Sequence, residues 1–262
     1  VLTTTVAQEQ LENFINTENI VALLVRSATT VRQDLIDACP NLKIIGRGGV
    51  GMDNIDVEYA RGKGLSVINT PAASSESVAE LVFAHLFSGV RFLYDSNRTM
   101  PLEGDSKFKN LKKAYAKGTE LRGKTLGVIG FGRIGQATAK MALGLGMKVI
   151  AFDPFLEKTT LSLAFYNGQT VDFEIKTVSK ETVLKESDFI TLHVPAQKEF
   201  VICEAELALM KDGSALINAA RGGVVNEVAL VAALDSNKLA FAGLDTFENE
   251  PTPAVQLLMN PK

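Results

Sequence analysis

Short apolar runs alternate with amphipathic stretches along almost the whole chain, and this alternation limits the folds that the chain can adopt. Runs typical of buried strands lie at 20–26, 42–46, 65–69, 124–130, 147–153, 188–194, 214–220 and 239–247. Stretches with helical spacing lie between them, at 31–39, 57–64, 133–146, 180–187, 203–211 and 226–238. Such alternation predicts an α/β fold of parallel sheets covered by helices on both faces.

Three segments interrupt this pattern. Residues 75–94 carry an apolar stripe that follows Ser and Glu capping signals, so we expect a long helix there. Residues 100–123 are polar and have no clear apolar face, which predicts a loop with partial helix. Residues 165–179 contain the turn signal Asn167-Gly168 and predict an inserted hairpin.

Composition excludes several classes of protein. The 262 residues are 46% apolar, enough for the core of one large domain or two smaller ones. A net charge of −3 without charge blocks argues against a nucleic-acid surface or a polybasic membrane anchor. No apolar run reaches the roughly 18 residues that a membrane helix requires. Cys39 and Cys203 fit no metal-binding spacing, so we expect no metal site and reduced thiols in the cytoplasm.

The stretch TLGVIGFGRIGQATAK predicts a site for a dinucleotide. Gly130, Gly132 and Gly135 follow an apolar strand and open a helix. The first glycine permits a tight turn, the second lets the backbone approach a pyrophosphate, and the third lets the helix pack closely. The helix N-terminus then offers N–H groups and partial positive charge to the anion.

Asp153 indicates which dinucleotide is bound. It ends the next predicted strand, 153 − 135 = 18 residues after the third glycine, close to the spacing of about 20 for this fold. A carboxylate there accepts hydrogen bonds from a ribose hydroxyl and repels a 2′-phosphate, which favours NAD over NADP. A flavin also fits the glycine pattern, although the motif begins well inside the chain.

Charged residues follow several other predicted strands. The carboxyl ends of parallel strands form the ligand-binding edge of an open α/β sheet, and a guanidinium there can clamp a carboxylate with two hydrogen bonds. Each of these residues also fits a solvated loop, but three arginines together suggest a small anionic substrate. The residues are Arg221, Asp245, Glu250, Arg26 with Ser27, and Arg47.

The two histidines have different settings. His85 lies inside the apolar stripe of 75–94 and is interpreted as structural. His193 ends a strand and is expected to line the cofactor site. Neither has an obvious carboxylate partner in the sequence, and the two as an acid–base pair stay open as an alternative.

Taken in order, the motifs VRSAT, GRGGVGMDNID, LRGKTLGVIGFGRIG, SDFITLHVP, INAARGGVVNE and AGLDTFENEP resemble the D-isomer-specific 2-hydroxyacid dehydrogenases. The resemblance implies two Rossmann- or flavodoxin-like domains with a cleft between them. Residues 1–72 would be the substrate domain and 73–262 the NAD-binding domain. It also implies NAD-dependent hydride transfer, and a homodimer or larger assembly in which the long helix serves the interface.

The resemblance also implies roles for individual residues. Arg221 would hold the carboxylate and carbonyl of the substrate, Glu250 would hydrogen-bond a catalytic histidine, and Asp245 would face the nicotinamide. The backbone of Arg133 and Ile134 would contact the pyrophosphate, while Val194, Pro195, Ala219 and Ala220 would line the cofactor. Val50 and Gly51 would donate N–H groups to the carboxylate. Arg26, Ser27 and Arg47 match positions near the phosphate in the branch that acts on a phosphorylated hydroxy acid.

Two features depart from the family pattern. The loop after NTP reads AASSES where the family often has Asn, so the chain departs from the family in that loop. The catalytic histidine of the family follows the glutamate of the EP motif at a longer distance than the 262 − 250 = 12 residues present here. We therefore expect a longer chain, with that histidine and a segment completing the 1–72 domain after Lys262. Reductases of unphosphorylated 2-oxo acids and an NAD-sensing binding protein remain as alternatives.

Overall fold

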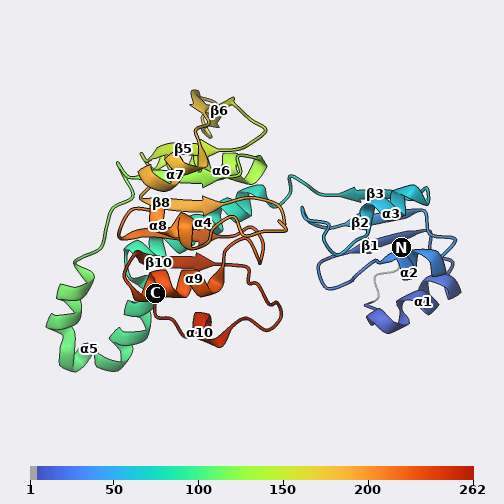
Figure 1. Cartoon of the computed structure of the whole chain (residues 1–262), viewed down its shortest axis with the longest axis horizontal. Helices are drawn as coiled ribbons and strands as arrows, with labels where there is room; N and C mark the ends of the chain where they lie inside the picture. The colour runs from blue at the N-terminus through green and yellow to red at the C-terminus, as the bar shows by residue number, and fades with distance from the viewer. Residues whose placement is uncertain (1–4) are drawn as a thin grey trace. The chain divides into compact units, whose positions relative to one another are not determined.

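The computed structural model describes residues 5–262. The chain divides into two compact units, Val1–Ser74 and Ser75–Lys262, and each is an α/β unit built on a parallel sheet (Figure 1). The predicted fold class is thereby confirmed. The two units are called the N-terminal and the C-terminal unit below.

The N-terminal unit contains a parallel sheet in the order β1-β2-β3 among its described residues. The strands are β1 (Ala22–Val25), β2 (Ile44–Arg47) and β3 (Ser66–Asn69), and the helices are η1 (Gln8–Gln10), α1 (Leu11–Thr17), α2 (Gln33–Ala38) and α3 (Val57–Gly62). Val25, Ile45 and Val67 pack with apolar side chains of the three α-helices in one core.

The opposite face of this sheet differs from the prediction. Leu24 is 76% exposed and Ile68 is 57% exposed, although both belong to apolar strands. The expectation of helices on both faces is therefore wrong for the described part of the N-terminal unit, because its helices all contribute to the core on one side.

The C-terminal unit contains a five-stranded parallel sheet in the order β10-β9-β8-β4-β5. Its strands are β4 (Thr125–Ile129), β5 (Lys148–Phe152), β8 (Phe189–Leu192), β9 (Ser214–Asn218) and β10 (Leu239–Leu244). Counted along this unit the order is 2-1-3-4-5, so the direction of winding reverses between β4 and β8. Open α/β sheets bind ligands at such a switch point, outside the carboxyl ends of the strands.

Helices cover both faces of this sheet, as predicted. One core joins it to α4 (Ser75–Val90) and α6 (Arg133–Gly144), through residues such as Leu86, Leu126 and Ala139. The other core contains Ile190, Leu216 and side chains of the helices α7 (Lys180–Glu186), α8 (Glu204–Leu209), α9 (Glu227–Asp235) and α10 (Val255–Leu258).

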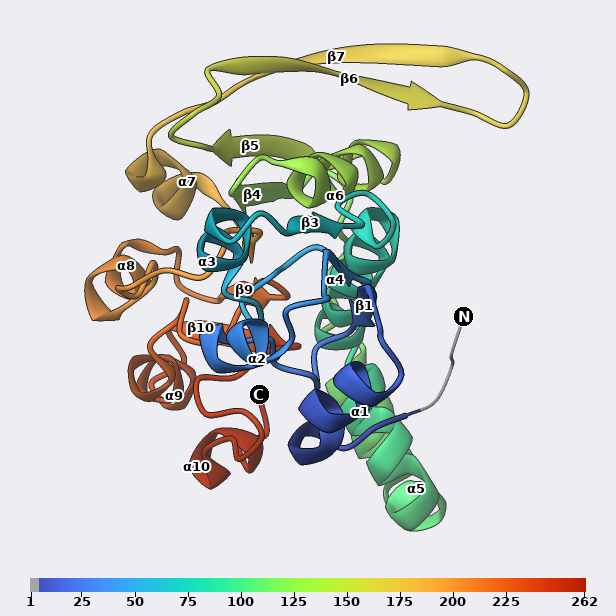
Figure 2. The ribbon, with the colours of Figure 1, turned by 90° about the vertical axis from the view of Figure 1, so that its right-hand side faces the viewer.

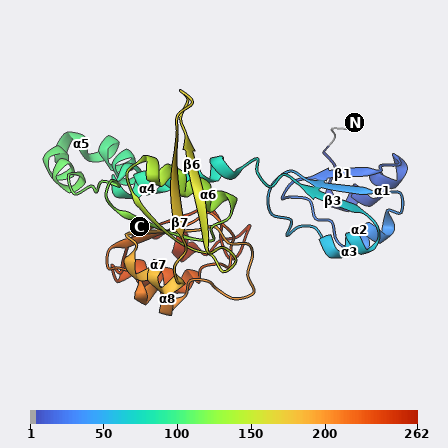
Figure 3. The same cartoon turned by 90° about the horizontal axis from the view of Figure 1, so that it is seen from above.

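The inserted hairpin is longer and starts earlier than predicted. Its strands are β6 (Lys158–Ala164) and β7 (Thr170–Lys176), paired antiparallel, so the predicted bounds 165–179 are wrong. The predicted turn is found, since Gly168 has φ +84° and its N–H donates to Phe165 O at 2.9 Å. Figure 2 shows the hairpin beside β5, and Figure 3 shows its tip extending away from the sheet.

The segment after α4 also differs from the prediction. The helix expected at 75–94 ends at Val90, and Phe92 then has a left-handed φ of 55°. A second helix, α5 (Leu93–Tyr115), follows and covers much of the segment 100–123, for which we predicted mainly loop. Helix α5 bends at Lys107 and folds back, so that the Tyr115 hydroxyl donates to Asp95 at 2.8 Å. No residue of α5 is buried, which explains why its sequence shows no apolar stripe. Within residues 5–262, no helix has the length and apolarity needed to cross a membrane.

Candidate functional site

The three glycines of the motif form a cradle at the switch point. A Cβ on Gly130, whose φ is +90°, would lie 2.5 Å from the His193 carbonyl oxygen, and one on Gly135 would lie 2.2 Å from Gly130 O. A Cβ on Gly132 would meet no described atom within 4 Å. Gly130 and Gly135 therefore permit close packing, while Gly132 leaves open space at the N-terminus of α6. That helix has no side-chain cap and no acidic residue in its first turn.

Asp153 stands beside this cradle, directly after β5. Its Oδ2 accepts a hydrogen bond from the Phe131 N–H at 2.8 Å, and its Oδ1 accepts one from the Phe155 N–H at 2.9 Å. The bond from Phe131 fixes the carboxylate against the glycine loop, and the bond from Phe155 holds it within the turn after β5. A carboxylate can accept further hydrogen bonds, so the side chain keeps the capacity to bind a ribose hydroxyl.

His193 follows β8 and faces helix α6. Its Nε2 lies 3.1 Å from Thr191 Oγ1 and 3.3 Å from Thr138 Oγ1. The Thr138 hydroxyl donates its hydrogen to Ile134 O at 2.9 Å, so we assign a proton to Nε2 that is shared by the two threonine oxygens. Burial lowers the pKa of His193 from 6.5 to about 4, which leaves the ring neutral at neutral pH.

The turn that carries Arg221 is held by Asn218, the last residue of β9. The Asn218 Oδ1 accepts from the Ala220 N–H at 3.1 Å, and its Nδ2 donates to Arg221 O at 3.0 Å. The Arg221 Nη1 donates to Ala220 O at 2.7 Å. The structure thus places Arg221 at the carboxyl edge of the sheet, as predicted from its position after a strand.

The loop that carries Glu250 packs against this turn. A Cβ on Gly222 would lie 1.8 Å from the Phe247 carbonyl oxygen, and Glu250 Oε1 accepts from the Phe247 N–H at 3.0 Å. Glu227 and Glu248 also join the two segments, because each carboxylate accepts the backbone N–H of the other at 2.7 Å. Burial raises the pKa of Glu227, and the Glu248 carboxylate adds to the effect.

Asp245 and His85 lie on the β10 side of the unit. The exposed Asp245 follows β10, and its N–H donates to Asn218 O at 3.0 Å. His85 packs so closely on β10 that a Cβ on Gly243 would lie 2.7 Å from the His85 Cβ. Burial lowers the pKa of His85, while Asp245 opposes the shift. His85 lines a cavity of about 940 Å³ along β10. Gly132, Asp153 and Arg221 do not line this cavity.

In the N-terminal unit, the loops after β1 and β2 contact each other. Gly48 N–H donates to Val25 O at 2.9 Å, and a Cβ on Gly48 would lie 3.7 Å from Arg26 Cγ. Arg47 folds back over its own loop, where its Nη1 donates to Gly48 O at 2.9 Å. The Asn69 Nδ2 donates to Val50 O at 2.7 Å. The predicted residues Arg26, Ser27, Val50 and Gly51 therefore lie in two adjacent loops, and Arg47 ends the strand before the second loop.

The remaining predicted residues also lie after strands of the C-terminal sheet. Arg133 and Ile134 begin α6, Val194 and Pro195 follow His193, and Ala219 and Ala220 are buried between β9 and Arg221. Among residues 5–262, no group of three or more His, Cys, Asp or Glu side chains could hold a metal ion.

Three residues that contact these segments were not identified from the sequence: Thr138 beside His193, Asn218 in the turn of Arg221, and Asn54, whose Nδ2 donates to Arg26 O and Thr29 O. An asparagine that ends a buried strand before a glycine turn is a recognisable signal, since its side chain bonds nearby backbone groups. That signal applies to Asn218. No comparable signal marks Thr138.

Comparisons with known proteins agree with this geometry. Residues 83–262 match the family model for the NAD binding domain of D-isomer specific 2-hydroxyacid dehydrogenases. The hydroxypyruvate reductase of Thermotoga maritima is 47% identical over 231 residues, which cover 87% of this chain and 70% of that protein. The D-3-phosphoglycerate dehydrogenase of Methanocaldococcus jannaschii is 42% identical over 231 residues, 87% of this chain and 41% of the relative.

A solved structure supports the same relationship. The NAD-dependent formate dehydrogenase of Staphylococcus aureus, solved in complex with NAD, has a TM-score of 0.74 and 28% identity, and the match covers 95% of this chain and 71% of that one. The glycine cradle and Asp153 lie within residues 83–262, the range that matches the NAD binding domain. The predicted cofactor and the predicted class of oxidoreductase are confirmed at the level of the family. The chain belongs to the D-isomer specific 2-hydroxyacid dehydrogenases.

Proposed function

We propose that the protein oxidises D-3-phosphoglycerate to 3-phosphohydroxypyruvate with NAD, a step of serine biosynthesis. The observation that carries this choice of substrate is the position of two arginines, Arg26 and Arg47, at the carboxyl ends of β1 and β2. Two guanidinium groups suit a phosphate monoester better than an uncharged substituent. Relatives named D-3-phosphoglycerate dehydrogenase, such as that of Bacillus subtilis at 40% identity, support the proposal.

The cofactor would be held by the cradle and Asp153. Gly132 caps the N-terminus of α6, Arg133 and Ile134 begin the helix, and a Cβ on Gly132 would meet no described atom within 4 Å, so the pyrophosphate would lie there. Asp153 would accept from the ribose and disfavour a 2′-phosphate. The bound nicotinamide supplies the hydride acceptor. Val194, Pro195, Ala219, Ala220 and His193 belong to the segments that would surround it.

Arg221 and Glu250 would do the work on the substrate. The Arg221 guanidinium would orient the carboxylate and polarise the carbonyl as it develops. Val50 and Gly51 would offer N–H groups to the carboxylate. Glu250 would orient an imidazole that takes the hydroxyl proton and would raise its pKa towards neutrality. His193 does not suit that role, since its Nε2 is engaged by Thr191 and Thr138.

A reductase of hydroxypyruvate or glyoxylate is the second candidate. The 47% identity to the Thermotoga maritima hydroxypyruvate reductase favours it. In that case Arg26 and Arg47 would not contact the substrate. An NAD-sensing protein without turnover is a third candidate, which the presence of both Arg221 and Glu250 disfavours.

A panel of acids separates these candidates. NADH absorbance would be followed in the intact protein with D-3-phosphoglycerate, D-glycerate, hydroxypyruvate and glyoxylate. Our proposal requires the highest kcat/KM for the phosphorylated acid and a selective loss for that acid in Arg26→Ala. An equal or higher kcat/KM for the unphosphorylated acids would favour the reductase, and cofactor binding without turnover would favour the sensor.

We further propose a cytoplasmic homodimer or larger homo-oligomer. Helix α5 carries exposed Leu93, Tyr94, Leu102 and Phe108 and buries none of its residues within the chain. These four exposed apolar side chains on one helix suit a contact with a second copy of the chain. Sedimentation of wild type and of a Leu102→Glu, Phe108→Glu variant would test this, and an unaltered mass in the variant would contradict the proposed interface.

A further inference from the structure

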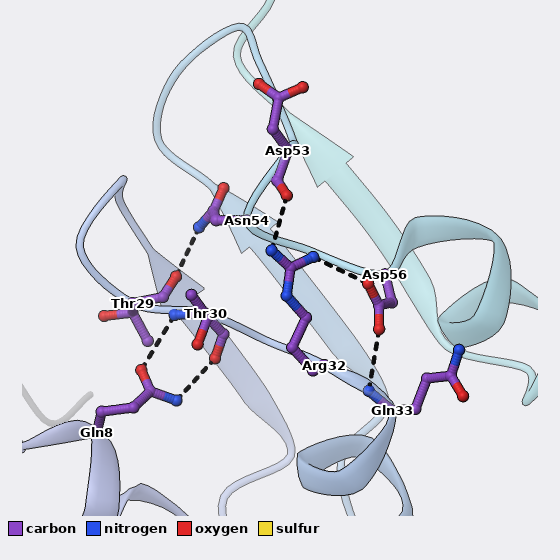
Figure 4. Close-up of polar contacts among 8 residues, drawn as sticks. All are labelled: Gln8, Thr29, Thr30, Arg32, Gln33, Asp53, Asn54 and Asp56. Carbon is purple, nitrogen blue, oxygen red and sulfur yellow. Dashed lines mark hydrogen bonds and ion pairs between the residues drawn. The ribbon is translucent and has the colours of Figure 1, made fainter. Parts of the chain in front are cut away.

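The two loops that carry the candidate substrate residues of the N-terminal unit are joined by the carboxamide of Asn54 (Figure 4). The Asn54 Nδ2 donates one hydrogen bond to Arg26 O at 2.9 Å and another to Thr29 O at 2.6 Å. One side chain from the loop after β2 therefore holds two main-chain positions in the loop after β1.

A wider network supports this contact. The Val31 N–H donates to Asn54 O at 2.8 Å, so the Asn54 backbone is fixed as well. Arg32 donates to Asp56 Oδ1 at 2.9 Å and to Asp53 O at 3.1 Å (Figure 4). Because the backbone around Asn54 is held independently of its side chain, a substitution of that side chain would chiefly release the 26–29 segment.

The chemistry of the contact requires an amide. Two carbonyl oxygens approach the same nitrogen, and a carboxamide nitrogen provides two hydrogens. An ionised carboxylate of the same shape provides none and would face both oxygens with negative charge. Asn54→Asp is therefore nearly isosteric, yet reverses the interaction.

We propose that Asn54 is a positioning residue, which sets the main chain of Arg26 so that its guanidinium can receive the anionic group of the substrate. This inference rests on the proposed function, in which Arg26 binds a phosphate. Arg26 is exposed, and its Cγ lies next to Gly48, so its place depends on how its backbone meets the neighbouring loop. Asn54 touches no proposed reacting group itself.

The test uses titration calorimetry to measure the affinity of the intact protein for NADH and, with NADH present, for two acids. D-3-phosphoglycerate carries the phosphate, and D-glycerate lacks it. For Asn54→Asp we expect the Kd of the phosphorylated acid to rise by about tenfold, the size of one or two lost hydrogen bonds. The Kd values of D-glycerate and NADH should stay within about twofold, since neither depends on Arg26.

Asn16→Asp is the matched control. The Asn16 Nδ2 also donates to a backbone oxygen of the same unit, Ala38 O at 3.0 Å, but far in sequence from the two loops. It should leave all three affinities unchanged. If Asn54→Asp fails to fold, Asn54→Ser keeps one donor without the negative charge and should give a smaller rise for the phosphorylated acid alone.

A double variant decides whether Asn54 acts through Arg26. Once Arg26 is alanine, Asn54→Asp should have no further effect on the Kd of the phosphorylated acid. A full additional loss in the double variant, an equal loss for both acids, or a change in melting temperature alone would overturn the inference. Failure of the proposed function is distinguishable, because wild type would then show no preference for the phosphorylated acid.

Discussion

Gly222 lies against the main-chain carbonyl of Phe247, where an added Cβ would come within 1.8 Å of the oxygen. This contact brings together the turn of Arg221 and the loop of Glu250, two segments from different strand ends. Two reciprocal hydrogen bonds between Glu227 and Glu248, each with an N···O distance of 2.7 Å, also join the two segments. The relative position of a proposed substrate clamp and a proposed orienting carboxylate therefore depends on a residue without a side chain.

Gly222→Ala should separate these loops. The obstacle is backbone rather than a flexible side chain, so the loops themselves have to move. We expect kcat/KM to fall by about 100-fold, as a displacement of about 1 Å in positioning groups can cause. The Kd of NADH should change little, because the glycine cradle lies elsewhere on the sheet edge.

Gly223→Ala serves as the control in the same turn. Gly223 has φ +73°, and an added Cβ would meet no described atom within 4 Å, so alanine introduces backbone strain without a collision. That strain amounts to about 1 kcal/mol. A loss of kcat/KM equal to that of Gly222→Ala would show that strain, and not the contact with Phe247, is responsible.

Gly132→Ala and Gly135→Ala should fail in different ways. A Cβ on Gly132 meets no described atom, so the melting temperature should not change. The Cβ would occupy the space proposed for the pyrophosphate, so the Kd of NADH should rise tenfold or more, a cost of roughly 1.4 kcal/mol. A Cβ on Gly135 meets Gly130 O at 2.2 Å, so that variant should lose stability first. Thermal melts and NADH fluorescence titrations measure both, and an unaltered NADH affinity in folded Gly132→Ala would argue against the pyrophosphate position.

Asp153→Ala should narrow the preference for NADH over NADPH. It removes the charge that opposes a 2′-phosphate together with the bonds to Phe131 and Phe155 at 2.8 and 2.9 Å. We expect weaker NADH binding and a ratio of affinities that falls by about tenfold. Asp172→Ala, an exposed carboxylate on the hairpin, is the control. A ratio that remains at the wild-type value would remove Asp153 from the ribose site.

The sequence predicted the structure best at positions where only one type of residue can satisfy the local geometry. At Gly130 and Gly135 another part of the backbone comes too close for any Cβ. Only glycine fits such positions, so the motif predicted both contacts. The strands were recognisable because buried parallel strands are continuously apolar. Helix α5 was not, because it buries nothing, and a helix without a packed face leaves no periodic signal.

The contacts that hold the loops were also beyond the sequence. Asn54 and Arg26 are 28 residues apart, and Thr138 and His193 are 55 apart. Whether such side chains meet is decided by the sheet order, which local patterns do not specify. The bounds of the hairpin were missed because only Leu161 of β6 is buried, so the strand carries little apolar signal in the sequence.

The neutral His193 makes stability depend on pH. Burial lowers its pKa from 6.5 to about 4, so between these values the unfolded chain binds a proton that the folded chain does not. The resulting contribution is fully present above pH 6.5 and is lost as the pH falls towards 4. From pH 6.5 to 5 the loss amounts to about 2 kcal/mol, at 1.36 kcal/mol per unit of pH.

His193→Gln should remove this dependence, because glutamine does not titrate while its amide can still donate towards Thr138 and Thr191. Urea unfolding at pH 7 and pH 5 would compare the variant with wild type, so that carboxylates common to both cancel. We expect wild type to lose about 2 kcal/mol more than the variant between the two pH values. His85→Gln, which removes the other histidine, should show a smaller effect, because Asp245 opposes the influence of burial on His85. Equal losses in wild type and His193→Gln would mean that the pKa of His193 is the same in the folded and the unfolded chain, which would contradict the lowering by burial.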